Sequence, residues 1–95
     1  MGKKKQIAIL GSTGSIGTQA LQVIGEHPGM YEVYCLTANN RVRELAEQAR
    51  RFHPAAVVIA NEARLDELRT LLADMPDVKV YAGARAIDEI VEAGP

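Results

Sequence analysis

Residues 7–17 read IAILGSTGSIG, a short apolar run followed by three evenly spaced glycines. The run Ile7–Leu10 has the composition of a β-strand, and apolar residues at helical spacing come after it. Between a strand and a helix, Gly11 allows a tight turn, Gly14 lets backbone N–H groups approach a phosphate, and Gly17 lets the helix pack closely on the strand. The start of the helix adds N–H groups and the positive end of its dipole. The stretch therefore predicts a dinucleotide-binding turn.

Two other interpretations of the glycines are possible. A strand-to-helix turn without a ligand also uses glycine, but here the motif has the strand-and-helix context that dinucleotide binding requires. A nucleoside-triphosphate loop needs Gly-Lys followed by Ser or Thr, whereas this chain has Ser15-Ile16-Gly17. We expect Ser12, Thr13 and Ser15 to reach phosphate oxygens or to shape the turn. We expect Ile16 to pack beneath the cofactor and into the helix–sheet interface.

The composition indicates one small domain over residues 1–95. Hydrophobic residues make up 47% of the chain and aromatic residues 4%, so aliphatic side chains fill the core. Eleven basic residues against twelve acidic ones give a net charge of -1, which argues against a nucleic-acid partner. The basic cluster Lys3–Lys5 is expected to be solvated.

No apolar run approaches the ~20 residues of a membrane span, and the N-terminus lacks a signal-peptide core. The single cysteine, Cys35, is expected to be buried and fits a reducing cytosol, so we expect a cytoplasmic protein without a membrane partner. His27 and His53 each precede a proline and are expected at helix ends. Neither has a second ligand at metal spacing, so no metal site is predicted.

The rest of the sequence alternates between strand and helix patterns. Strands are expected at 7–10, 33–38, 56–60 and 78–81, each followed by an amphipathic helix. Four such units predict an α/β fold, a three-layer Rossmann-like parallel sheet with helices on both faces. The fourth strand could lie beside the first strand or outside the third. We expect it outside the third, which leaves the first strand as an exposed edge if its usual neighbour is missing. The sheet is expected to be truncated, because a full two-half Rossmann domain with a substrate domain needs well over ~150 residues.

The residues that follow the second strand indicate which of the two nicotinamide cofactors, NAD or NADP, the domain binds. NAD-selective domains place an acidic residue there, which would repel a 2′-phosphate. This chain has Ala38-Asn39-Asn40-Arg41, with no acid and with one cation suited to a phosphate. The alternative is that Asn40 caps the second helix and Arg41 is solvated in its first turn. The missing acid favours NADP over NAD.

The glycine stretch, LGSTGSIG at residues 10–17, closely resembles the opening motif of the 1-deoxy-D-xylulose 5-phosphate reductoisomerase family. The resemblance continues through His27-Pro28, the strand ending at Ala38 and Phe52-His53-Pro54, and so covers essentially the whole chain. It implies that Thr13, Gly14, Ser15 and Ile16 contact NADPH. The family commonly shows Ala-Gly-Lys-Asn where this chain has Ala38-Asn39-Asn40-Arg41, so the positive charge lies one residue later. Asn39, in place of glycine, is expected to adopt a left-handed conformation.

The resemblance implies an NADPH-dependent enzyme that isomerises and reduces 1-deoxy-D-xylulose 5-phosphate to 2-C-methyl-D-erythritol 4-phosphate in non-mevalonate isoprenoid synthesis. It also implies a bound Mg or Mn ion, a sugar-phosphate substrate and a homodimer at full length. No catalytic or metal-binding residue is assigned within residues 1–95, and the chain alone is expected to bind the nucleotide without catalysing. Two alternatives stay open: another NADP-dependent reductase with the same turn, and a non-catalytic NADP-sensing module.

Overall fold

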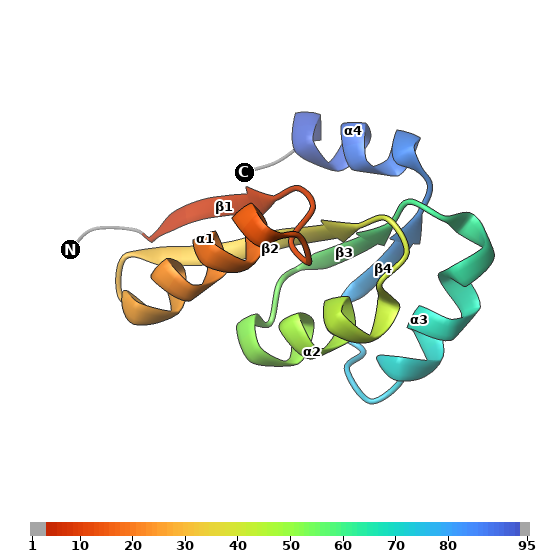
Figure 1. Ribbon diagram of the computed structural model, residues 1–95, viewed down its shortest axis with the longest axis horizontal. Helices are drawn as coiled ribbons and strands as arrows, with labels where there is room; N and C mark the ends of the chain where they lie inside the picture. The colour runs from red at the N-terminus through yellow and green to blue at the C-terminus, as the bar shows by residue number, and fades with distance from the viewer. Residues whose placement is uncertain (1–3, 94–95) are drawn as a thin grey trace.

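A four-stranded parallel sheet forms the centre of the molecule (Figure 1). The computed structural model describes residues 4–93. The strands lie side by side in chain order, from β1 at one edge to β4 at the other, and all pairs are parallel. Their bounds are β1 Lys5–Ile9, β2 Tyr31–Ala38, β3 Ala56–Ile59 and β4 Lys79–Ala82. The predicted parallel sheet and the outer place of the fourth strand are confirmed, and within residues 4–93 the first strand lies at the exposed edge, as expected.

Helices cover both faces of this sheet, as the sequence predicts. Figure 1 shows α1, α2 and α3 along one face and α4 across the other, where it packs against β3. Successive strands step in one direction across the sheet, and right-handed crossovers then place the connecting helices on one face. The helices are α1 Ser15–Glu26, α2 Val42–Phe52, α3 Leu65–Leu71 and α4 Ala84–Ala93, with a short 3₁₀ helix, η1 Glu62–Arg64, before α3.

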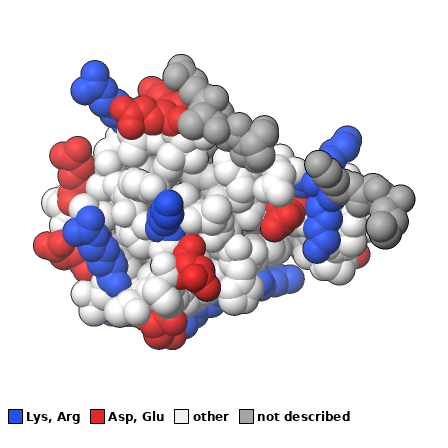
Figure 2. All heavy atoms as spheres, turned by 180° about the vertical axis from the view of Figure 1, so that it is seen from behind, with Lys and Arg blue, Asp and Glu red and all other residues white. Residues whose placement is uncertain are grey.

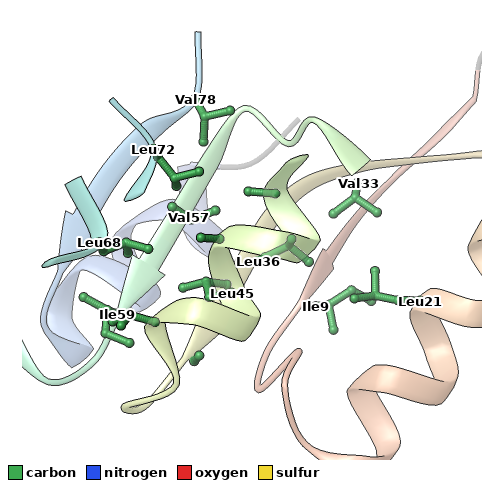
Figure 3. Close-up of a cluster of buried hydrophobic side chains, with 14 of the residues drawn as sticks. Ile9, Leu21, Val33, Leu36, Leu45, Val57, Ile59, Leu68, Leu72 and Val78 are labelled. Atoms are coloured by element: carbon green, nitrogen blue, oxygen red, sulfur yellow. The ribbon is translucent and has the colours of Figure 1, made fainter. Parts of the chain in front are cut away.

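The hydrophobic core lies between the sheet and the helices of the first face (Figure 3). Leu36 and Ile59 from the strands, Leu45 from α2 and Leu68 from α3 are fully buried there. Cys35 is also fully buried, as predicted, and burial raises the pKa of its thiol to about 11. The core thus joins β2 and β3 to α2 and α3.

The helix ends agree with the sequence, and His27 and His53 occupy the positions just after α1 and α2. His53 has a left-handed backbone with φ 49°, and its N–H closes α2 by donating to the carbonyl of Ala49. Lys4 and Lys5 are exposed, whereas Lys3 lies outside the described residues. On the face that Figure 2 shows, basic and acidic side chains are interspersed, and the described residues form no patch of one sign there.

The prediction that Ile16 packs into the helix–sheet interface is wrong. Its side chain is 84% exposed, and Leu10 and Val23 are more than half exposed. The outer side of β1 has no neighbouring strand among the described residues, so the flank of α1 on that side faces solvent. In α3, Leu68 is buried, whereas Leu65 and Leu71 are only half-buried.

Candidate functional site

The turn between β1 and α1 has the shape that its glycines predict. Gly11 has φ 69°, a left-handed conformation that glycine adopts without strain, and its carbonyl accepts the N–H of Gly14 at 3.0 Å. A Cβ atom on Gly17 would lie 2.4 Å from the carbonyl oxygen of Gly11 and 2.7 Å from the Cα atom of Ser12. Only glycine at position 17 therefore lets α1 approach the turn this closely.

The N-terminus of α1 carries no compensating group. Gly14 is its N-cap residue, no side chain caps it, and the first turn contains no acidic residue. The first N–H groups of a helix have no partner within the helix, and they carry the positive end of its dipole. This end of the helix is therefore suited to an anion.

The loop after β2 lies beside the turn. Asn39, Asn40 and Arg41 are exposed there, and Arg41 is the N-cap residue of α2. The alternative in which Asn40 caps α2 is therefore wrong. The left-handed conformation expected of Asn39 is also wrong, because His53 is the one non-glycine residue with positive φ among the described residues. The carbonyl of Asn39 instead accepts the N–H of Asn61 at 3.0 Å, which ties this loop to the loop after β3.

A chain of hydrogen bonds orients the amide of Asn40. The backbone N–H of Ala63 donates to Asn61 Oδ1 at 3.0 Å, so the Nδ2 group of Asn61 points the other way. That group donates to Asn40 Oδ1 at 2.7 Å. Asn40 consequently keeps its own N–H groups for a ligand.

The turn and the loop together line one open groove of about 430 Å³. Arg41 takes part in neither ion pair found among the described residues, which are Arg50–Asp74 and Arg64–Glu67. Seven of the predicted site residues form the lining: Gly11, Thr13, Gly14, Ser15, Asn39, Asn40 and Arg41.

The other four predicted residues lie elsewhere. Ser12 and Ala38 are buried beneath the groove, and Gly17 is the packing position described above. Ile16 lines a neighbouring apolar hollow along the outer side of β1, together with Leu10.

Two residues that the sequence analysis missed hold the turn in place, Thr37 and Gln48. The N–H of Gly11 donates to Thr37 Oγ1 at 2.9 Å, and the N–H of Ser12 donates to the carbonyl of Thr37 at 2.8 Å. Gln48 of α2 hydrogen-bonds to both the hydroxyl and the carbonyl of Ser12. For Thr37 the signal available in the sequence was a polar residue within an otherwise apolar strand. Gln48 is one of several polar residues of α2, and the sequence gives no such signal for it.

Within residues 4–93, no three His, Cys, Asp or Glu side chains lie close enough together to hold a metal ion. No helix in this described part is long and apolar enough to cross a membrane.

The sheet order, the glycine turn and the adjoining polar loop define the class of Rossmann-like α/β domains. The model of the 1-deoxy-D-xylulose 5-phosphate reductoisomerase family matches residues 7–95. The chain belongs to this family.

Comparison with individual proteins agrees with this assignment. The 1-deoxy-D-xylulose 5-phosphate reductoisomerases of Bacteroides fragilis and Porphyromonas gingivalis are 70% and 53% identical over 98% and 95% of this chain. A solved structure of the Zymomonas mobilis reductoisomerase in complex with NADPH has a TM-score of 0.87 and 37% identity, over 92% of this chain and 23% of that one. A reductoisomerase structure with NADPH, fosmidomycin and magnesium has a TM-score of 0.84 and 33% identity, over 90% of this chain and 21% of that one.

The chain spans about a quarter of the length of the curated relatives it matches, 24% for the Bacteroides fragilis protein and 23% for the Porphyromonas gingivalis protein.

Proposed function

We propose that this chain is the NADPH-binding part of a 1-deoxy-D-xylulose 5-phosphate reductoisomerase. The observation that carries the proposal is the groove that Gly11–Ser15 and Asn39–Arg41 line together. One wall is an anion-binding helix start, and the other offers neutral donors and a cation. A dinucleotide with a pyrophosphate and a phosphorylated ribose needs both.

The pyrophosphate end is assigned to the glycine turn and the start of α1. The uncapped N-terminus and the absence of an acidic residue in the first turn leave the positive end of the helix available. Thr13 and Ser15 line the groove at this end, and their hydroxyl groups can donate to phosphate oxygens.

The phosphorylated ribose is assigned to the loop after β2. Arg41 lines the groove and provides a planar cation that matches a 2′-phosphate. The oriented amide of Asn40 adds donors. Glu44, the acidic residue in the first turn of α2, does not line this groove, so no carboxylate there opposes the phosphate.

The proposed activity of the longer protein is the isomerisation and reduction of 1-deoxy-D-xylulose 5-phosphate to 2-C-methyl-D-erythritol 4-phosphate in isoprenoid synthesis. NADPH supplies the hydride, and the residues of this chain bind and orient the nucleotide. The described residues hold no group of metal ligands, so the Mg or Mn ion and the sugar phosphate are assigned to the rest of the protein. We also propose that the longer protein is a homodimer and acts in the cytoplasm.

The family match supports this function over the two alternatives, another NADP-dependent reductase and an NADP-sensing module. Neither alternative is favoured by an observation of its own.

Isothermal titration calorimetry of the chain with NADPH and with NADH tests the proposal. We expect saturable binding of NADPH, weaker binding of NADH and no turnover of the sugar phosphate by this chain alone. Absence of NADPH binding, or a preference for NADH, would contradict the assignment of the groove.

A further inference from the structure

Gln48 joins the glycine turn to helix α2 through two hydrogen bonds to one residue. Its Oε1 accepts from the hydroxyl of Ser12 at 2.6 Å, and its Nε2 donates to the carbonyl of Ser12 at 2.9 Å. A carbonyl oxygen can only accept, so this contact fixes which end of the amide faces it. Gln48 is half-buried and Ser12 fully buried, so water competes little for these bonds.

The turn needs such an external restraint because its own residues restrict it weakly. Two of its four residues, Gly11 and Gly14, are glycines, which have the widest backbone freedom. Ser12, between them, is held by Thr37 of β2 on one side and by Gln48 on the other. These contacts select one conformation of the turn.

The same helix also carries the opposite wall of the groove. Arg41 is the N-cap residue of α2, and Gln48 lies seven residues further on, about 10 Å along the helix axis. The two hydrogen bonds of Gln48 therefore hold the turn against α2, the helix whose start carries the Arg41 loop. Gln48 does not line the groove itself.

We infer that Gln48 is a positioning residue that holds the glycine turn of the nucleotide groove in place without touching the nucleotide. The inference rests on the proposed function of the groove. The pyrophosphate and the adenosine are common to NADPH and NADH, so a loosened turn weakens the binding of both by the same factor. This distinguishes Gln48 from Arg41, which is assigned to the 2′-phosphate alone.

The test compares Gln48→Met with the wild-type chain. Methionine keeps the length of the side chain but makes neither hydrogen bond. We expect the Kd values of NADPH and NADH to rise together, by about three- to tenfold, with their ratio unchanged. Calorimetry is done well below the thermal midpoint of each variant, so that loss of folded protein does not enter the Kd.

Two further variants control for a general loss of packing. Gln22→Met alters a glutamine of α1 that faces the same space between α1 and α2 but whose side chain makes no hydrogen bond among the described residues. It should leave both Kd values unchanged. Gln48→Glu keeps the shape and the acceptor of the side chain but has no N–H for the Ser12 carbonyl. It should therefore raise the Kd values of both nucleotides.

The outcomes separate this inference from the proposed function. If the wild-type chain binds NADPH and the Gln48 variants bind it equally well, the inference is wrong and the proposed function stands. If the Gln48 variants lose affinity for NADPH but not for NADH, Gln48 acts on the 2′-phosphate and the inference is also wrong. If the wild-type chain binds neither nucleotide, the proposed function fails and the inference fails with it.

Discussion

At the scale of single residues, Gly17 has the strictest geometric requirement in the site. A side chain there would meet backbone atoms of Gly11 and Ser12, and backbone cannot move aside as the end of a flexible side chain can. Gly25, near the other end of α1, is a contrasting case, because a Cβ atom there would meet the guanidinium end of Arg51 at 2.9 Å. The two glycines thus predict opposite effects for the same substitution.

We expect Gly17→Ala to lower the free energy of unfolding by about 1–3 kcal/mol, as overpacking does elsewhere. Gly25→Ala is the matched control, and it should leave stability unchanged or raise it by up to ~1 kcal/mol, because alanine favours a helix and Arg51 can shift. Urea unfolding followed by circular dichroism measures both. Equal stability of Gly17→Ala and wild type would contradict the close approach of α1 to the turn.

The sequence could predict which residues form the groove but not how the residues beneath it are bonded. Seven of the eleven predicted site residues line the groove, because the ends of parallel strands meet at one edge of the sheet. The bond between Ser12 and Gln48 joins residues 36 apart in the chain, and no local pattern specifies it. The contacts that the groove residues make with a nucleotide stay a prediction.

At the scale of elements, strand order and helix placement were predictable, and the exposure of Ile16 on α1 was not. The alternation of strands and helices specified a parallel sheet with right-handed crossovers. The exposed edge at β1 was predicted, but its consequence for α1 was not: no strand among residues 4–93 lies beyond β1, so Ile16 faces solvent and not a packed interface. Asn39 was misassigned because its backbone is set by the distant Asn61, whose N–H its carbonyl accepts.

Asn61 illustrates how one residue serves two elements. Its Oδ1 accepts the N–H of Ala63 at the start of η1, and its Nδ2 donates to Asn40 in the loop before α2. We expect Asn61→Ala to lose the cap and about 1 kcal/mol of stability. Asn61→Asp keeps an acceptor for Ala63 and should lose less, as measured by thermal or urea unfolding. Equal losses in the two variants would show that the cap contributes nothing.

At the scale of the whole molecule, Cys35 reports on the integrity of the sheet. Its thiol is fully buried, and burial raises its pKa to about 11 because the thiolate is poorly solvated there. We expect iodoacetamide at pH 8 to modify Cys35 only when the sheet opens, so the labelling rate should follow the free energy of unfolding as urea is added. Rapid labelling in the absence of urea would contradict the burial of Cys35.

The raised pKa also sets the direction of a pH effect. Above the ordinary thiol pKa of about 9 the unfolded chain loses this proton and the folded chain keeps it, so stability falls as the pH rises from about 9 towards 11. Cys35→Ala lacks this contribution and serves as the reference for other groups that titrate in the same range. Between about pH 9 and 11, the free energy of unfolding of the wild type should therefore fall relative to that of Cys35→Ala.

The central claim is that one groove holds NADPH, with Arg41 on its 2′-phosphate. The most direct measurement is the Kd of NADPH and of NADH for Arg41→Ala beside Arg43→Ala, an exposed arginine of α2 that does not line the groove. We predict that Arg41→Ala raises the Kd of NADPH by about ten- to a hundredfold and leaves the Kd of NADH unchanged, because a charge-assisted bond to the phosphate is lost. Arg43→Ala should bind both nucleotides as the wild type does. Unchanged NADPH binding in Arg41→Ala, or an equal loss of both nucleotides, would contradict the account.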